Sequence, residues 1–237
     1  MIEAPFLEAS LSYRRDGFTL RAEFTLRSQW TVLFGASGAG KTTLLRILAG
    51  LTQPDSGFIR LSNHPLLDTS RSLALPPHQR GIGFVLQQSA LFPHLTAREN
   101  IAFGLHQWTR TERDARIKEL LSLFEIGSLA DRKPRQLSGG ERQRIAVAQA
   151  LAPRPKVLLL DEPFNALDAP SRATIIGKLR AAAVPVLYVS HDLADAWQIN
   201  AHAILIESGA ILSEGETRTI LAPQRLQILT QLGVPLK

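Results

Sequence analysis

Apolar and polar positions divide the chain into short strand-like runs and longer helix-like segments. Residues 6–13 and 18–26 both read as strands, and Asp16-Gly17 lies in the segment that joins them. An Asp-Gly pair between two such runs is a strong signal for a hairpin turn. The chain is therefore expected to begin with two antiparallel strands.

Further short apolar runs follow, each bounded by turn-forming or polar residues. Residues 157–160 are apolar without interruption, which is typical of a parallel strand buried on both faces. The segment 62–80 is rich in Pro, Ser, Asn and His and is expected to be a loop or an edge region. The predicted strands after the first pair are residues 30–34, 58–61, 82–86, 157–160, 186–189, 203–206 and 210–212, the last two forming a hairpin around Ser208-Gly209.

Between about residues 89 and 152 the pattern becomes helical. Thr96–Glu99 and Ser138–Glu141 both match the capping box S/T-x-x-E, which marks the start of a helix. The helices that they begin are expected to run through Phe103 and to stop before Pro153, respectively. Two further helices are predicted over residues 43–49 and from Thr111, with Asp114, to about Phe124. Towards the C-terminus the predicted helices are one with Pro170 in its first turn, residues 193–200 capped by Asp192, and the tail, 217–237.

The segment Gly35–Thr42 carries the spacing G-x-x-x-x-G-K-T between a predicted strand and a predicted helix. That context predicts a phosphate-binding loop. Its glycines let the backbone fold closely around an anion, and its N–H groups and the helix N-terminus face the β- and γ-phosphates. Lys41 adds a positive charge there, and Thr42 places a hydroxyl where Mg²⁺ would bind.

Polar residues follow three of the predicted strands. Asp161 and Glu162 end the apolar strand 157–160, at the edge where α/β sheets place ligands. Asp161 is expected to hold Mg²⁺, directly or through water, and Glu162 to polarise the water that attacks the γ-phosphate. Gln87 could contact both the metal and that water. His191 could bind the γ-phosphate, although a lone histidine after a strand is often structural or solvated.

Ser138, Gly139 and Gly140 lie at a second predicted helix N-terminus, which makes a second anion site. One chain with two sites for a γ-phosphate is explained economically by a head-to-tail pair. Each nucleotide then lies between the phosphate loop of one copy and the Ser-Gly-Gly helix of the other, and such a pair closes on itself by twofold symmetry.

Composition narrows the class of protein. The chain has 237 residues, of which 45% are hydrophobic and 20% charged, and this suits one α/β domain, with or without an inserted subdomain. Cysteine is absent, which excludes disulfides, a thiol nucleophile and cysteine-ligated zinc. The formal charge of +6 fits nucleotide, nucleic acid or anionic lipid partners, although scattered basic residues of an ordinary soluble protein would give the same value.

Nothing in the sequence predicts a membrane span or a leader. No apolar run approaches the ~18 residues that a span requires, and residues 1–5 lack the basic and apolar regions of a signal peptide. The chain is therefore expected in the cytosol or on the cytosolic side of a membrane.

Six ordered motifs resemble those of ATP-binding cassette (ABC) ATPases and cover nearly the whole chain: Gly35–Thr42, Gln87, Leu137–Gln143, Leu158–Glu162, Asn165–Asp168 and His191. The resemblance implies an α/β fold, with a phosphate-loop NTPase core, a mostly parallel sheet, an N-terminal antiparallel β-subdomain and an inserted α-helical subdomain. Residues 1–88 and 154–216 would form the core, 89–153 the helical subdomain and 217–237 a helical tail. Asn165 departs from the family's usual serine but keeps hydrogen-bonding capacity.

The resemblance also implies roles for individual residues. Tyr13 would stack on adenine, with Phe18 as a nearby aromatic alternative. Glu162 would be the catalytic base and His191 the switch histidine, acting with Lys41 and Gln87, and Asp168 would couple the two sites of the dimer. ATP would bind to Gly35, Ala36, Ser37, Gly38, Ala39, Gly40, Lys41, Thr42 and Thr43 and to the partner's Ser138, Gly139 and Gly140, and Mg²⁺ to Thr42, Gln87 and Asp161.

Three segments indicate the branch of the family. Leu91–Thr96 resembles bacterial importer subunits, and Trp30–Thr42 and Leu75–Arg80 are most similar to molybdate-import ATPases. Thiamine- and sulfate-type importers are near alternatives. Molybdate-import ATPases usually carry a further C-terminal β-domain, for which we expect no room in this sequence.

An importer subunit implies partners at the membrane. The expected partners are a second copy of the chain, a membrane permease and, indirectly, a periplasmic or extracellular solute-binding protein, with the chain peripheral on the cytoplasmic face of the inner membrane. We hypothesise that a groove between the Gln87 loop and the helix from Thr96 receives a short cytoplasmic helix of the permease. The alternative is that the groove residues only close the core of the helical subdomain. The apolar residues concerned are Leu91, Phe92, Leu95, Ile101 and Phe103.

Two other functions are alternatives to transport. Cassette proteins that act on nucleic acid have long coiled-coil arms or two cassettes in one chain, and this sequence shows one cassette without sustained heptads. No nucleic-acid partner is therefore expected. A phosphotransferase or small GTPase would have no role for the Ser138–Arg144 block.

Overall fold

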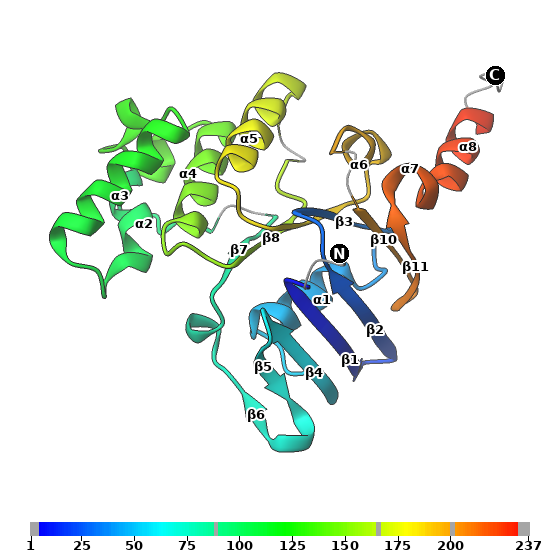
Figure 1. Ribbon diagram of the computed structural model, residues 1–237. Coiled ribbons are helices and arrows are strands. Elements are labelled where there is room, and N and C mark those ends of the chain that lie inside the picture. Colours follow the sequence, from blue (N-terminus) through cyan, green and yellow to red (C-terminus); the bar gives the residue numbers. More distant parts are fainter. Residues whose placement is uncertain (1–4, 88–89, 165–166, 200–201, 232–237) are drawn as a thin grey trace. The chain divides into compact units, whose positions relative to one another are not determined.

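The computed structural model describes residues 5–87, 90–164, 167–199 and 202–231 (Figure 1). The chain folds as two compact units. The first unit consists of residues 1–80 and 185–237, and the second of residues 81–184. The finer subdomain boundaries expected from the sequence stay a prediction.

A mixed sheet forms the first unit, and its described strands follow the order β6-β5-β4-β1-β2-β11-β10-β3-β9. The strands β1, β2, β4, β5 and β6 pair antiparallel, whereas β3 pairs parallel with both β9 and β10. Their bounds are β1 (Leu7–Arg15), β2 (Phe18–Leu26), β3 (Trp30–Phe34), β4 (Ser56–Leu61), β5 (His64–Asp68), β6 (Leu73–Ala74), β9 (Val186–Ser190), β10 (His202–Glu207) and β11 (Ala210–Glu216).

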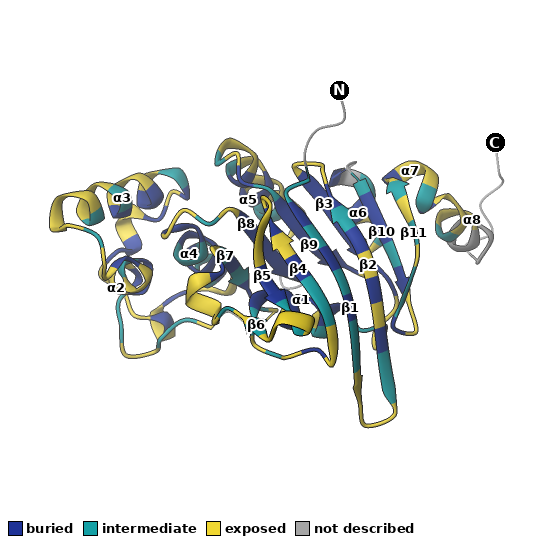
Figure 2. Ribbon diagram, turned by 60° about the horizontal axis from the view of Figure 1, so that its bottom comes forward, coloured by how far each residue is buried: buried dark blue, intermediate teal, exposed yellow. Residues whose placement is uncertain are grey.

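The predicted N-terminal hairpin is confirmed. Asp16 and Gly17 have φ of 50° and 80°, the left-handed values that a two-residue hairpin turn requires. Burial alternates along β2, as Figure 2 shows, so Leu20, Ala22 and Phe24 face the core. By contrast, all residues of β3 and β9 are buried, as expected for parallel strands covered on both faces.

The segment 62–80 is an edge region, as expected, but it is more regular than a loop. Residues 64–68 form β5, with Leu66 and Leu67 buried, and β6 follows at the edge of the sheet. The edge strand β6 has only two residues, and such short edge strands limit the further pairing of a sheet. Single 3₁₀ turns over Thr69–Arg71 and Pro77–Gln79 complete the segment.

Four helices belong to the described part of the first unit: α1 (Lys41–Ala49), α6 (Leu193–Ile199), α7 (Thr217–Ile220) and α8 (Ala222–Gln231). The predicted cap of α6 is confirmed, because Asp192 Oδ1 accepts the N–H of Ala194 at 2.7 Å. The tail was expected to be one helix and is two in the described residues. Pro223, near the start of α8, has no N–H to continue the preceding helix.

The second unit combines the parallel pair β7 (Ile82–Val85) and β8 (Val157–Asp161) with helices. The helices are α2 (Ala97–Ala102), α3 (Arg110–Leu123), α4 (Gly139–Leu151) and α5 (Ala169–Ala181), with single 3₁₀ turns over Phe103–Leu105, Gly127–Leu129 and Pro134–Gln136. In this unit α2 packs against both α3 and α4, and α4 packs against β7.

Two of the three expected capping patterns are confirmed, those of Thr96 with Glu99 and of Ser138 with Glu141. The third was placed wrongly. The cap of α3 is Thr109, whose Oγ accepts the N–H of Glu112 at 3.3 Å while the Glu112 carboxylate accepts the Thr109 N–H at 3.1 Å. Glu112 is long enough to reach back to the cap, and the sequence T-x-x-E was present two residues before the predicted start.

A buried arginine holds the C-terminal end of α1. Arg80 is 3% exposed, and its guanidinium donates to the carbonyl oxygens of Ile47 and Leu48, each at 2.8 Å, and of Leu75 at 2.9 Å. The last carbonyls of a helix lack partners within the helix, and a cation there also complements the helix dipole. Burial lowers the pKa of Arg80, so the carbonyls compensate a charge removed from water.

No helix among the described residues combines the length and the apolar character that crossing a membrane requires.

We predict that Arg80→Met lowers the free energy of unfolding by at least about 2 kcal/mol, because three charge-assisted hydrogen bonds are lost and buried carbonyls are left without donors. Denaturant unfolding would measure this. Arg71→Met is the matched control, since the Arg71 side chain is 80% exposed and surface ion pairs contribute little. Equal stability of the two variants would contradict the assignment.

Candidate functional site

The phosphate loop closes around the ammonium group of its own lysine. Gly35 follows the last residue of β3, and Lys41, 5% exposed, begins α1. Lys41 Nζ donates to the carbonyl oxygens of Gly35 at 2.8 Å and Ala36 at 2.9 Å. The loop therefore holds a buried cation at its base, while Ala36, Ser37 and Gly38 are exposed on its rim.

Two glycines give the loop its curvature. Gly38 and Gly40 have φ of 81° and 100°, in the left-handed region that other residues rarely adopt. Gly40 is also the N-cap of α1, and its carbonyl accepts the N–H of Leu44 at 2.9 Å. Successive N–H groups in such a loop, together with a helix N-terminus, form a concave anion site. Thr42 and Thr43, in the first turn of α1, are exposed and half-buried respectively.

The two candidate aromatic residues share one face of the β1–β2 hairpin. A Cβ added to Gly40 would lie 2.7 Å from Phe18 Cζ and 3.3 Å from Leu20 Cδ1, so both side chains reach the loop. Tyr13 is the cross-strand partner of Leu20, and such partners point to the same side. Phe18 packs against the loop itself, whereas the stacking role of Tyr13 stays a prediction.

His191 leaves the sheet beside the phosphate loop. The parallel strands β3 and β9 pair with Phe34 opposite Ser190, so Gly35 and His191 are the next residues of neighbouring strands. His191 is exposed. The turn that carries it is shaped by the N–H of Asp192, which donates to Ser190 Oγ at 2.9 Å. The first unit thus brings together the phosphate loop and the predicted switch histidine.

In the second unit, Gln87, Asp161 and Glu162 lie at the ends of a parallel strand pair. The register places Val85 opposite Leu160. Gln87 Nε2 donates to Glu162 Oε2 at 3.1 Å across a separation of 75 residues. Asp161 is 2% exposed. The acid pair and the amide predicted to serve one reaction are therefore neighbours.

Glu162 has an unusual backbone conformation. Its φ is 46°, in the left-handed region, where a non-glycine residue is strained. Such strain persists only where the surrounding structure enforces it, and it is concentrated at functional sites. At this residue it turns the chain directly after the buried strand β8.

Ser138 and Gly139 are exposed at the N-terminus of α4, and Gly140 is half-buried. The Ser138 Oγ accepts the N–H of Glu141 at 3.3 Å, and the Glu141 carboxylate accepts the Ser138 N–H at 2.7 Å. These hydrogen bonds from Ser138 hold the pKa of Glu141 below its ordinary value. The Ser-Gly-Gly turn is thus preformed and open to solvent within its own unit.

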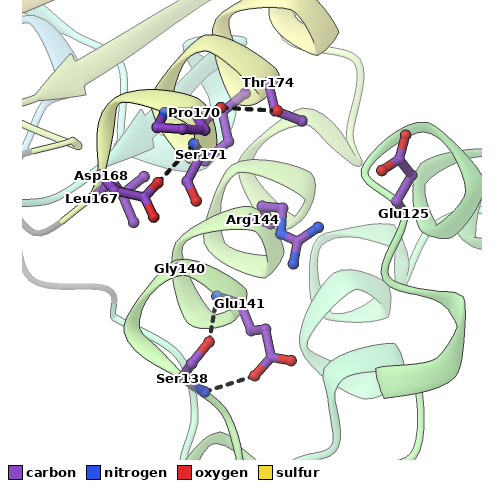
Figure 3. Close-up of a pocket in the computed structure, with 11 residues that line it drawn as sticks. Glu125, Ser138, Gly140, Glu141, Arg144, Leu167, Asp168, Pro170, Ser171 and Thr174 are labelled. Carbon is purple, nitrogen blue, oxygen red and sulfur yellow. Dashed lines mark hydrogen bonds between the residues drawn. The ribbon is translucent and has the colours of Figure 1, made fainter.

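An open pocket of about 420 Å³ adjoins this turn, between the N-terminal parts of α4 and α5 (Figure 3). Asp168, the cap of α5, lies on its rim, and hydrogen bonds from Ser171 lower the pKa of Asp168. The pocket is also lined by Glu125, Arg144 and Thr174, for which sequence reasoning assigned no role. Their separation along the chain left no local signal. Asn165 and Ala166 lie outside the described residues.

The candidate residues therefore form one group in each unit. The phosphate loop, Tyr13 and His191 belong to the first unit, and Gln87, Ser138–Gly140, Asp161, Glu162 and Asp168 belong to the second. The predicted metal ligands Thr42, Gln87 and Asp161 offer a hydroxyl, an amide and a carboxylate. These oxygen donors fit a hard cation such as Mg²⁺, which takes few protein ligands beside phosphates and water.

The proposed permease groove needs one correction. Ile101 is fully buried, so it closes the helical core rather than lining a groove. Leu91, Phe92 and Leu95 are half-buried. Phe103 is 58% exposed, and its ring lies 4.3 Å from that of Phe92.

Comparison with known proteins gives consistent matches. The family model described as ABC transporter matches residues 21–165. The Molybdenum import ATP-binding protein ModC of Pseudomonas savastanoi pv. phaseolicola is 41% identical over 232 residues, which are 96% of this chain and 64% of that protein. The Molybdate/tungstate import ATP-binding protein WtpC of Archaeoglobus fulgidus is 39% identical over 227 residues, which are 94% of this chain and 92% of that protein. The chain thus spans less than two thirds of the first relative and most of the second.

Among solved structures, cbiO1 from Clostridium perfringens, described as part of the ABC transporter complex cbiONQ, is similar with a TM-score of 0.80 at 23% identity. The match covers 98% of this chain and 97% of that one. This likeness confirms the α/β fold predicted from the sequence.

We predict that Gly40→Ala destabilises the ligand-free protein more than Gly38→Ala does. Both variants place alanine at a positive φ, at a cost of about 1–2 kcal/mol. Only at Gly40 would the new Cβ meet the Phe18 ring, since nothing lies within 4 Å at Gly38. Thermal unfolding without nucleotide would compare the two, and adding Phe18→Leu should relieve part of the Gly40→Ala loss. Equal losses in both single variants would contradict the observed packing.

Proposed function

Since the chain belongs to the ABC transporter family, we propose that it is the ATP-binding and ATP-hydrolysing subunit of an importer. The observation that carries this proposal is the presence in one chain of a phosphate loop and of a preformed, exposed Ser-Gly-Gly helix start. Each is half of a nucleotide site. Two chains in head-to-tail arrangement would complete both sites.

Binding of ATP is assigned to the phosphate loop. The N–H groups from Gly35 to Thr43 would face the β- and γ-phosphates, and Lys41, held at the base of the loop by two carbonyls, would exchange those acceptors for phosphate oxygens. Thr42, Gln87 and Asp161 would hold Mg²⁺, which supplies charge neutralisation between the β- and γ-phosphates when bound. Tyr13 would stack on the adenine.

Hydrolysis is assigned to Glu162, with Gln87 and His191. The Glu162 carboxylate would accept a proton from the attacking water, which requires hydrogen-bond reach to that water. Gln87 already donates to this carboxylate, so it would orient the base. His191 would donate to the γ-phosphate as negative charge develops on its oxygens. Asp168 would couple the two sites across the dimer.

The transported solute is proposed to be molybdate or a related oxyanion. The support is the names of the relatives, molybdenum import and molybdate/tungstate import. The solute would contact a permease and a solute-binding protein rather than this chain, which would be peripheral on the cytoplasmic face of the membrane. Thiamine and sulfate are the alternative solutes.

We predict that Glu162→Gln keeps ATP binding, lowers turnover at least about a hundredfold because the base is lost, and traps a dimer. Light scattering after size exclusion with ATP and Mg²⁺ would measure the mass. Lys41→Ala is the comparison variant and should weaken ATP binding itself. A Glu162→Gln variant that binds ATP but remains monomeric would count against the head-to-tail arrangement.

We also predict that a cysteine in place of Phe103 cross-links to a cytoplasmic helix of the permease in a nucleotide-dependent way, because the exposed Phe103 and the half-buried Phe92 offer an apolar docking surface. The chain has no native cysteine, so the background is low. A cysteine in place of the exposed Asp114 on α3 is the control. No cross-link at Phe103, or equal cross-linking at both sites, would remove this surface from consideration.

A further inference from the structure

A buried hydrogen bond spans the segment that carries His191. The Tyr188 hydroxyl, on β9, donates to Asp195 Oδ2, on α6, at 2.9 Å. Tyr188 is 1% exposed and Asp195 is 3% exposed. Tyr188 lies three residues before His191 and Asp195 four residues after it, so the bond closes the strand-to-helix connection with the exposed histidine at its apex.

Two further hydrogen bonds shape this connection, and both are local and at least partly exposed. Asp192 N–H donates to Ser190 Oγ, and Ala194 N–H donates to Asp192 Oδ1. Water competes for such bonds, which shape the turn but restrain it weakly. A hydrogen bond in the low-dielectric interior is electrostatically stronger than one exposed to water. The Tyr188–Asp195 bond is therefore a buried side-chain restraint between α6 and β9, in addition to the packing of α6 against β3 and β9.

Burying a carboxyl group between two elements costs free energy, because the group is removed from water. Replacing such groups with apolar residues of similar shape is often neutral or stabilising. Its presence beside His191 therefore calls for a role beyond stability. Such a role would be to hold His191 in place, because β9 runs parallel to β3 and ends beside the phosphate loop.

We propose that Tyr188 and Asp195 are positioning residues that hold His191 at the place where a γ-phosphate would lie. This inference rests on the proposed function, in which His191 contacts the γ-phosphate. The bond links β9 to α6, whereas the N–H groups and the lysine proposed to hold the phosphates of ATP come from the β3–α1 loop and the first turn of α1. Loss of the bond therefore lowers the rate of hydrolysis without weakening the binding of ATP.

The test removes the bond from either side. Tyr188→Phe keeps the ring and its packing but loses the donor, and Asp195→Ala removes the acceptor. Each variant is expected to lower kcat for ATP by about tenfold to a hundredfold, the effect of misplacing a reacting group by about 1 Å, with Kd for ATP unchanged within about twofold. Asp195→Asn keeps an acceptor oxygen and is expected to retain a higher kcat than Asp195→Ala.

Two reference variants make the outcome decisive. Ile59→Ala, in the buried part of β4, loses stability far from His191 and should keep kcat below its melting temperature. His191→Ala reports on the proposed function. If His191→Ala hydrolyses ATP normally, the assigned role of His191 is wrong. If His191→Ala is inactive while Tyr188→Phe and Asp195→Ala are normal, only the positioning inference is overturned. Loss of ATP affinity or of the folded state in both variants would also overturn it, because the bond would then be purely structural.

Discussion

The parallel pairing of β3 with β9 is the constraint that brings the phosphate loop and His191 together. Because Phe34 lies opposite Ser190, the residues that follow these strands leave the sheet at the same edge. One is Gly35, the first glycine of the phosphate loop, and the other is His191. A shift of register by two residues would separate them by about 7 Å along the strand direction. Burial of every residue in both strands opposes such a shift.

The site residues of the second unit depend on the equivalent pairing of β7 with β8. This pairing brings the amide of Gln87 and the strained Glu162 into hydrogen-bonding distance. This group also includes a helix start that is open to solvent. Neither group alone contains everything that phosphoryl transfer needs: a phosphate cradle, a metal ligand set and a positioned base. The account of function therefore requires the groups to act together, and the exposed Ser-Gly-Gly turn to act on a second copy.

The sequence predicted those features whose signals are local. The Asp16-Gly17 turn, the caps at Thr96 and Ser138, and the phosphate loop each lie within a few residues, so their geometry follows from backbone preferences and hydrogen bonds between near neighbours. The Thr109–Glu112 cap has the same kind of local signal, a T-x-x-E pattern within four residues. The buried strands were also predictable because their apolar runs are uninterrupted.

Contacts between distant residues could not be predicted in this way. Arg80 meets the end of α1 more than thirty residues away, and Phe18 meets Gly40 across a turn, a strand and a loop. The buried Tyr188–Asp195 bond joins two residues that look unremarkable in sequence, since a tyrosine in a strand and an acid in a first helical turn are both common. Burial decides their roles, and burial is a property of the folded chain.

The central claim is that two copies of the chain clamp ATP between the phosphate loop of one and the Ser-Gly-Gly turn of the other. Since the chain has no cysteine, oxidative cross-linking between two single-cysteine variants, Ser37→Cys and Ser138→Cys, tests it most directly. The account predicts a disulfide-linked dimer when the two variants are mixed with ATP, and none with either variant alone or without nucleotide. Absence of that dimer in a mixture of variants that both bind ATP would contradict the account.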